Sequence, residues 1–161
     1  MATEGRPAAR GDATADGLVV AIVVARYHEG ITGRLLEGAR AELIERGVAE
    51  EDILVETAPG AFELPLLALG YASREEVDAV VCLGCVIRGD TDHYQWVCQG
   101  VTNGVQQVSL ETGIPVGFGV LTCETVEQAD ARAGGAEGNK GREAAAAALE
   151  TIAALDRIAE D

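Results

Sequence analysis

Apolar residues follow two patterns along this chain, and the two patterns alternate. Continuous apolar runs rich in β-branched residues are typical of strands that are buried on both faces of a parallel sheet. Between them, apolar residues recur at the spacing of an amphipathic helix. The runs predict strands at residues 18–24, 52–57, 77–87 and 116–121. The helical spacing predicts helices at residues 31–46, 62–73 and 139–159, a long helix between residues 93 and 113, and a short one after Thr125.

Short sequence signals mark the ends of several of these helices. Gly47 has the position of a C-cap, and Pro65 is tolerated only in the first turn of its helix. Thr125 and Gln128 have the spacing of a capping box. The Gly134–Gly135 pair interrupts the chain before the last helix. Strands and helices therefore alternate along the chain, except that the last two helices follow one another.

This alternation predicts an α/β fold. Right-handed crossovers place helices on both faces of a four-stranded parallel sheet, so the expected architecture is flavodoxin-like and doubly wound. The length of 161 residues suits a single domain, expected at residues 17–161. Residues 1–16 are small, polar and rich in glycine and alanine, and we predict a disordered tail there.

Composition excludes several classes of partner. The net charge is −15, whereas phosphate backbones and anionic membrane surfaces require basic patches, so we expect neither a nucleic acid nor a membrane as partner. No segment approaches the ~20 consecutive apolar residues of a membrane span, and the N-terminal residues lack the apolar core of a signal peptide. We therefore expect a cytoplasmic protein.

Four cysteines raise the question of a metal or redox site. Cys82 and Cys85 form a C-x-x-C pattern, but both lie within the apolar run of residues 77–87. Residues three apart on a strand point to opposite faces, so this pair cannot chelate one ion. We interpret these cysteines as small buried residues in a reducing compartment, and we expect no metal site.

Polar and aromatic residues gather directly after the predicted strands, where ligands bind in doubly wound sheets. Both histidines of the chain lie in these loops. The four segments in question are residues 26–29, 58–63, 88–93 and 121–124.

The loop after the third strand carries the clearest candidate chemistry. Residues 84–91 imitate a phosphate-binding P-loop, but Asp90 stands where that motif has its lysine, so nucleotide binding of that kind is not expected. Residues 89–91 still lead into a helix N-terminus, where free N–H groups suit an anion. His93 opens that helix, either as a proton-transfer group or as a capping residue. His28 is a weaker candidate for contact with a ligand than His93.

Other candidate residues have two readings each. Aromatic rings at strand ends, such as Tyr27 and Phe62, could stack on a planar ligand, whereas core packing is the expected role of Tyr94 and Trp96. Glu63 could accept hydrogen bonds from hydroxyl groups or simply favour a helix N-terminus. Basic residues surround the glycine-rich connection of residues 133–141, either as a binding cluster or as solvated surface: Arg132, Lys140 and Arg142.

Several of these segments together resemble the lumazine synthase family, and they occur in family order and spacing. The resemblance covers the chain after the tail, and the segments that carry it are residues 25–28, 59–65, 83–94, 119–122, 127–134 and 138–141.

The resemblance implies a transferase of riboflavin biosynthesis. Members of the family condense 5-amino-6-(D-ribitylamino)uracil with 3,4-dihydroxy-2-butanone 4-phosphate. The products are 6,7-dimethyl-8-ribityllumazine, phosphate and water. Imine formation, phosphate elimination and ring closure require positioning and proton transfer, and no cofactor takes part.

The resemblance also implies residue roles. Tyr27 would stack on the pyrimidine, with backbone contacts from Val86 and Ile87. His93 would transfer protons. Contacts to the ribityl chain would come from Gly60, Ala61, Phe62 and Glu63, and the phosphate loop would be Gly89, Asp90 and Thr91. The neighbouring subunit would supply Phe118, Arg132 and Lys140, with Arg132 holding the phosphate.

Such a shared site implies a homo-oligomer. The family forms pentameric rings, and the short connection at residues 133–141 favours the icosahedral capsid built from twelve rings. One departure is Gln95, where the family usually has an acidic residue. Gln95 keeps open a lumazine or flavin carrier without activity, beside the related archaeal-type riboflavin synthase and a pure shell protein. The segment of residues 59–63 and His93 favour lumazine synthase.

Overall fold

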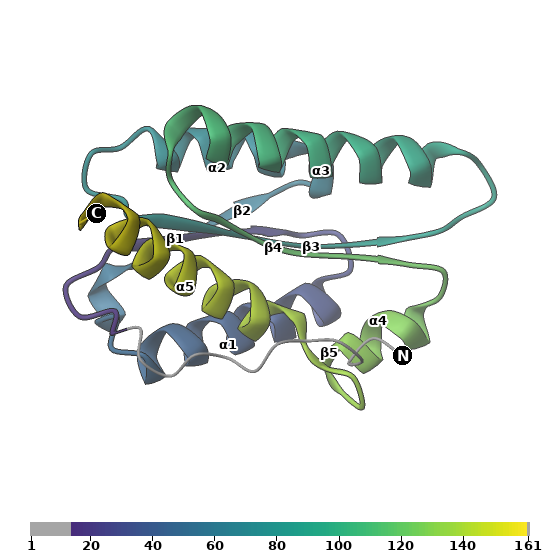
Figure 1. The fold of residues 1–161 in the computed structure, drawn as a ribbon. Coiled ribbons are helices and arrows are strands. Elements are labelled where there is room, and N and C mark those ends of the chain that lie inside the picture. The colour runs from purple at the N-terminus through teal and green to yellow at the C-terminus, as the bar shows by residue number, and fades with distance from the viewer. Residues whose placement is uncertain (1–13, 161) are drawn as a thin grey trace.

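A four-stranded parallel sheet forms the centre of the molecule, with strand order β2-β1-β3-β4. A computed structural model describes residues 14–160. The strands are β1 (Val20–Ala25), β2 (Ile53–Ala58), β3 (Ala79–Ile87) and β4 (Val116–Cys123). Figure 1 shows that all four run in the same direction, so that their carboxyl ends meet at one edge of the sheet. The predicted α/β, flavodoxin-like doubly wound fold is confirmed.

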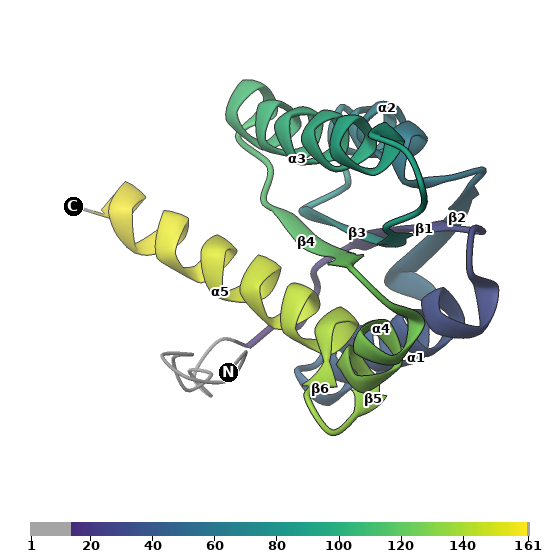
Figure 2. The ribbon, with the colours of Figure 1, turned by 90° about the vertical axis from the view of Figure 1, so that its right-hand side faces the viewer.

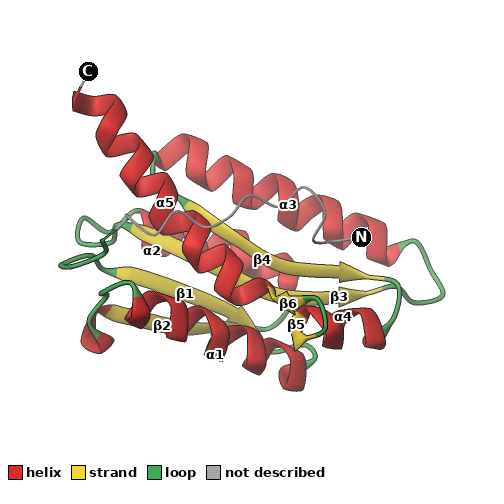
Figure 3. Ribbon diagram, turned by 60° about the horizontal axis from the view of Figure 1, so that its bottom comes forward, coloured by secondary structure: helices red, strands yellow, loops and turns green. Residues whose placement is uncertain are grey.

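Helices cover both faces of this sheet. Two of them pack on one face, α2 (Leu64–Ala72) and α3 (His93–Thr112). The opposite face carries α1 (Glu29–Glu45), α4 (Val126–Arg132) and α5 (Lys140–Glu160) (Figures 1 and 3). Short 3-10 helices, η1 (Glu50–Asp52) and η2 (Ala61–Glu63), precede β2 and α2. Figure 2 shows the last turns of α5 projecting beyond the sheet.

The alternation of side chains along β3 gives each face of the sheet its own core. Cys82 packs with Val80 and Leu64 beneath α2 and α3, whereas Cys85 packs with Leu83 and other residues beneath α1 and α5. The two cysteines of the C-x-x-C pattern therefore lie on opposite faces of the sheet, as their spacing predicted.

Most helix ends follow the sequence signals. The cap residue of α1 is Arg46, and Gly47, which follows it, has a φ of 109°, a backbone conformation that favours glycine. The hydroxyl of Thr125 accepts a hydrogen bond from the N–H of Gln128 (3.2 Å). The side chain of Gln128 returns to the N–H of Glu124 (2.8 Å) instead of to the cap residue, one position earlier than in a capping box.

The connection between the last two helices contains structure that the sequence did not predict. Two very short strands, β5 (Ala133–Gly135) and β6 (Gly138–Asn139), form an antiparallel hairpin. Gly134 and Gly138 both have positive φ angles, of 101° and 84°. Glycine adopts these angles without strain, so the connection can reverse direction sharply.

The expected disordered tail, residues 1–16, lies mainly outside the described residues. Within the described part, the side chain of Ala15 is fully buried, and its N–H donates to the carbonyl of Arg46 (3.0 Å). Packing against the body of the domain thus begins before residue 17. Among the described residues, no helix is both long and apolar enough to cross a membrane.

Candidate functional site

A cavity of about 650 Å³ opens at the carboxyl ends of β1, β2 and β3. Its walls come from the loop after β1, from η2, from the end of β3 and from the first turns of α3. The volume falls within the ~300–1,000 Å³ typical of small-molecule sites. The sequence placed its candidate residues after the strands, and the structure brings most of them together in this one cavity.

Most of the candidate site residues line the cavity. They are Tyr27, Gly60, Ala61, Phe62, Glu63, Val86, Ile87, Gly89, Thr91 and His93. Asp90 belongs to the same loop, but it is exposed and is not part of the lining. Phe118, Arg132 and Lys140 also lie outside this cavity.

Three large aromatic side chains at the cavity stand open to solvent. Tyr27 is 69% exposed, Phe62 is 62% exposed and Trp96 is 67% exposed. An added Cβ at Gly100 would come within 2.7 Å of the Phe62 ring, so this ring packs directly on the backbone of α3. Rings that are fixed in place and exposed offer stacking surfaces for a planar ligand.

Core packing was the wrong expectation for Trp96 and Tyr94, because both residues line the cavity. Helical spacing correctly placed Val101 and Val105 in the core. Trp96 precedes Val97 by one position, and this step turns a side chain by about 100° around a helix. That rotation moves the Trp96 side chain from the core to the cavity edge. A helical projection of the α3 sequence could have predicted this position.

The backbone at His28 adopts an uncommon conformation. Its φ of 59° and ψ of 56° make it the only residue besides glycine with a positive φ in the described range. The carbonyl of His28 accepts hydrogen bonds from the N–H groups of Ile31 and Thr32, which open α1. The imidazole meets the ring of Tyr27 edge-on, with 5.5 Å between the ring centres. This turn sets the direction of Tyr27 at the cavity wall.

The carboxylate of Glu63 has a structural contact and remains accessible to the cavity. Its Oε2 accepts a hydrogen bond from the N–H of Gly60 (3.1 Å), which holds the first turn of η2. Glu63 also lines the cavity and is exposed. A carboxylate has two oxygens and about four acceptor positions, so a single hydrogen bond leaves capacity for hydroxyl groups.

His93 is the first residue of α3, and its side chain faces the cavity. The cap position belongs to Asp92, whose side chain makes no capping hydrogen bond. The N–H of His93 donates to the hydroxyl of Thr91 (3.3 Å), so the loop and the helix start are tied together. An imidazole at this place can exchange protons with a bound ligand.

Cys85 also belongs to the cavity lining, but burial raises the pKa of its thiol to about 12. A thiol with such a pKa remains protonated at neutral pH and is a poor nucleophile. Among the described residues, no group of three or more histidine, cysteine or acidic side chains could hold a metal ion.

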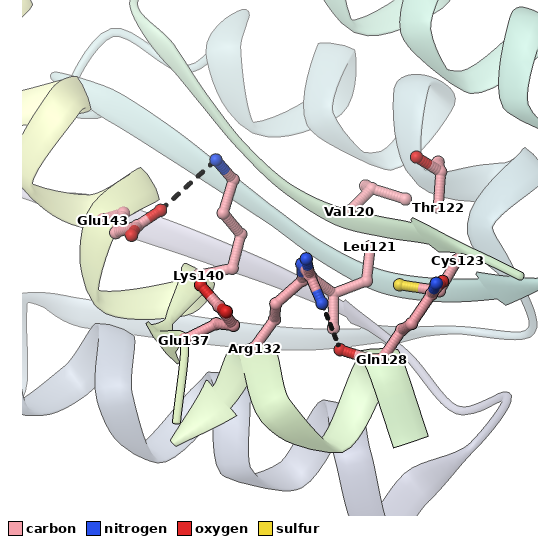
Figure 4. Close-up of a pocket in the computed structure, with 9 residues that line it drawn as sticks. All are labelled: Val120, Leu121, Thr122, Cys123, Gln128, Arg132, Glu137, Lys140 and Glu143. Carbon is pink, nitrogen blue, oxygen red and sulfur yellow. Dashed lines mark hydrogen bonds and ion pairs between the residues drawn. The ribbon is translucent and has the colours of Figure 1, made fainter. Parts of the chain in front are cut away.

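A second, smaller cavity of about 280 Å³ lies between β4, α4 and the start of α5. Figure 4 shows the side chains of Arg132 and Lys140 in this space, together with the carboxylates of Glu137 and Glu143. The Arg132 guanidinium donates to the carbonyl of Gln128 (2.9 Å). Arg132 takes part in none of the ion pairs found among the described residues.

The predicted basic cluster is therefore only partly formed. Lys140 joins Arg132 in the second cavity and pairs with Glu143 (3.3 Å). Arg142 instead turns towards α1, where it lies 2.7 Å from both Glu42 and Glu45. The prediction that Arg142 clusters with the other two cations was wrong, because the ion pairs of Arg142 join α5 to α1.

Comparison with known families agrees with the resemblance seen in the sequence. The family model described as 6,7-dimethyl-8-ribityllumazine synthase matches residues 17–156. The match covers the whole sheet, both cavities and most of α5.

Proposed function

Since this chain belongs to the 6,7-dimethyl-8-ribityllumazine synthase family, we propose that its reaction takes place in the larger cavity and that a second copy of the chain completes the site. The protein is a transferase of riboflavin biosynthesis. It joins 5-amino-6-(D-ribitylamino)uracil to 3,4-dihydroxy-2-butanone 4-phosphate, and it releases 6,7-dimethyl-8-ribityllumazine, phosphate and water. What remains to be assigned is the part played by each residue.

The pyrimidine substrate fits the aromatic side of the cavity. Its planar ring would stack on Tyr27, while the backbone groups of Val86 and Ile87 bind the ring edge at the end of β3. The ribityl chain would lie along residues 60–63, where the Glu63 carboxylate accepts hydrogen bonds from its hydroxyl groups. The exposure of the Tyr27 ring and its fixed turn support this placement.

The phosphate would bind at the loop that leads into α3. Gly89 and Thr91 line the cavity there, and Asp90 lies beside them in the same loop. The helix that follows has 20 residues, and its N-terminus carries a partial positive charge. His93, beside this loop, would move protons during imine formation, phosphate elimination and ring closure. Holding both substrates close together supplies the remaining acceleration.

The positive charge for the phosphate would come from another subunit. Arg132 and Lys140 belong to the second cavity, on the far side of β4, which is an edge strand of the sheet. A heterologous contact between two copies would bring the β4 edge and Phe118 of one subunit to the larger cavity of the next. The observation that carries this proposal is the separation of the two sets of candidate residues into different cavities of one chain.

Mixing two defective variants tests the shared site directly. His93→Ala and Arg132→Ala should each be impaired alone. When equal amounts of the two variants assemble together at random, about a quarter of the sites should combine a native His93 from one subunit with a native Arg132 from its neighbour. The mixed assembly should therefore regain activity in about a quarter of its sites. Each variant mixed with itself is the control. No recovery in assemblies verified to contain both variants would place His93 and Arg132 in the same subunit's site and contradict the proposal.

Repetition of this contact would close a ring, and we propose a pentamer that assembles further into an icosahedral capsid. The tight hairpin between α4 and α5 supports close contacts between rings. Exposed apolar side chains next to the cavity, such as Phe62 and Leu66, support a subunit interface there. Light scattering across a salt series is the test, because the net charge of −15 makes rings repel at low salt. A particle of pentamer size at every ionic strength would rule out the capsid.

We also propose a cytoplasmic location. Its support is the set of four cysteines, all free, of which Cys82, Cys85 and Cys123 are buried. Such thiols are typical of reducing compartments. Fractionation of cells that produce the protein would test this.

A further inference from the structure

Two residues that flank the proposed phosphate loop contact each other through their side chains. Arg88 is the first residue after β3, and Tyr94 is the second residue of α3. The guanidinium carbon of Arg88 lies 4.4 Å from the centre of the Tyr94 ring. Cation–π contacts extend to about 6 Å, so this distance is a close one. The contact joins the two ends of the segment that carries Gly89, Thr91 and His93.

Arg88 is itself held in place by the end of β4. Its N–H donates to the carbonyl of Cys123 (2.9 Å), which extends the β3–β4 ladder by one hydrogen bond. Its Nε lies 3.0 Å from Oε1 and 2.9 Å from Oε2 of Glu124. The guanidinium thus lies between a carboxylate on one strand end and an aromatic ring on the neighbouring helix.

The cavity wall includes Tyr94 but not Arg88. Arg88 therefore reaches the site through the Tyr94 ring and through the ends of the loop. Because Glu124 neutralises its charge at close range, Arg88 adds little net attraction for an anion in the cavity. These facts indicate that Arg88 affects the cavity through the geometry of the loop and not through its charge.

We infer that Arg88 is a positioning residue that holds the loop of residues 89–93 in the geometry that binds the phosphate of the butanone substrate. This inference rests on the proposed role of that loop. It predicts that loss of the contact to Tyr94 lets the two loop ends separate. The binding of the phosphorylated substrate then weakens, while the pyrimidine, held by Tyr27 and the end of β3, is little affected.

The chain contains a matched control for this contact. Arg74 lies 5.7 Å from the ring centre of Tyr71 and pairs through its Nε with Glu76 (2.8 Å). It has the same two kinds of partner as Arg88, but it follows α2 and lines neither of the two cavities described above. Arg74→Met removes an equivalent pair of contacts away from the loop.

The experiment compares Arg88→Met with Arg74→Met in steady-state kinetics, with each substrate varied in turn. Arg88→Met should raise the KM for the butanone phosphate roughly three- to tenfold, the range expected from losing an exposed ion pair together with a cation–π contact. The KM for the pyrimidine should stay within about twofold. Inorganic phosphate, used as a competitive probe, should lose affinity by the same factor as the substrate. Arg74→Met should change neither KM.

Glu124→Gln separates geometry from charge. If Arg88 acts by position, removing its carboxylate partner loosens the guanidinium, and the KM for the butanone phosphate rises. If Arg88 acts as a free positive charge, the same change unmasks that charge, and the KM falls. Arg88→Lys should be intermediate, because lysine keeps the cation over the ring but loses the planar fork.

Several results would overturn the inference: unchanged constants in Arg88→Met, an equal rise in both KM values, or a lower KM in Glu124→Gln. Urea unfolding of every variant shows whether an effect follows stability alone, since Arg74→Met and Arg88→Met should lose a similar amount of unfolding free energy.

Thr91→Ala tests the loop itself. If Thr91→Ala leaves phosphate affinity unchanged, the proposed loop is wrong. If it lowers that affinity and Arg88→Met does not, only the role of Arg88 is wrong.

Discussion

Gly141, the second residue of α5, packs directly against the backbone of α1. A Cβ at residue 141 would overlap the carbonyl oxygen of Leu35 and would come within 2.7 Å of its carbonyl carbon and 2.9 Å of its Cα. These are backbone atoms inside α1, so they cannot swing aside as a side chain would. Gly141→Ala therefore forces the two helices apart, above a core that contains Ala145 and Leu149.

The magnitude follows from two opposing effects. Alanine in place of glycine favours a helix interior by about 0.5–1 kcal/mol. Inserting a methyl group into a well-packed contact costs about 1–3 kcal/mol. Because the overlap involves rigid backbone, the cost prevails, and we expect a net loss of about 1–2 kcal/mol in the free energy of unfolding. Gly33→Ala in α1 is the matched control, since its Cβ would meet no atom within 4 Å, and it should add about 0.5–1 kcal/mol.

Urea unfolding followed by circular dichroism measures both variants. All samples need one protein concentration, because the stability of an oligomer depends on it. The two midpoints should move in opposite directions from that of the parent protein. A midpoint for Gly141→Ala at or above the parent value would refute the reasoning that the α1–α5 contact has no room for a side chain.

The other predictions concern the site and two titrating groups. His93→Ala should lower kcat roughly 10–10³-fold in steady-state assays with little change in either KM, the usual scale of a lost proton-transfer group; an unchanged kcat would remove His93 from the mechanism. Arg132→Ala should mainly raise the KM for the butanone phosphate, and Arg132→Lys should restore it only in part, because the planar bidentate guanidinium is lost; a defect confined to the pyrimidine would contradict this. The hydrogen bond from Arg142 holds the pKa of the Glu45 carboxyl below its ordinary value of 4.5, so its stabilising contribution is present above that pH and is lost as the pH falls through the lowered value. Glu45→Gln should therefore lose less stability than the parent protein in acid unfolding experiments, and identical acid curves would refute the role of this pair. Burial raises the pKa of Cys82 to about 12, so this thiol should resist alkylation at pH 8 until the protein unfolds, and rapid labelling of the folded protein would show that it is accessible.

The sequence predicted the sheet and its helices because periodicity reports burial directly. Strands such as β3 are buried on both faces and so appear as continuous apolar runs, while α1 and α3 show the helical period. Helix and strand ends were placed within a few residues, as the caps at Gly47 and Thr125 allowed. The gathering of candidate residues into one cavity followed from the rule that parallel strands end at the same edge.

Other features depend on contacts between distant residues, which periodicity does not report. The β5–β6 hairpin contains only a few residues, mostly glycine, and has no apolar pattern of its own. The partner of Arg142 could not be read from its neighbours in sequence, because Glu42 and Glu45 lie about 100 residues away. The cation–π contact between Arg88 and Tyr94 likewise depends on how the loop of residues 89–93 folds back. The sequence pattern of a helix start does not predict the conformation of that loop.

The distribution of paired cations explains how so acidic a chain can bind a phosphorylated substrate. Several arginines elsewhere in the described part of the chain are paired with carboxylates, as Arg40 is with Glu50 and Arg74 is with Glu76. Arg132 instead donates to a backbone carbonyl, which cannot neutralise its charge. A guanidinium without an ion pair is costly only if it is buried, and Arg132 borders an open cavity that Glu137 and Glu143 also line. In an assembly where that cavity faces the phosphate loop of the next subunit, the same guanidinium gains its counter-charge from the substrate itself. Binding of the phosphate and closure of the subunit contact should therefore favour each other, so inorganic phosphate should stabilise the assembled ring more than an equal ionic strength of chloride does.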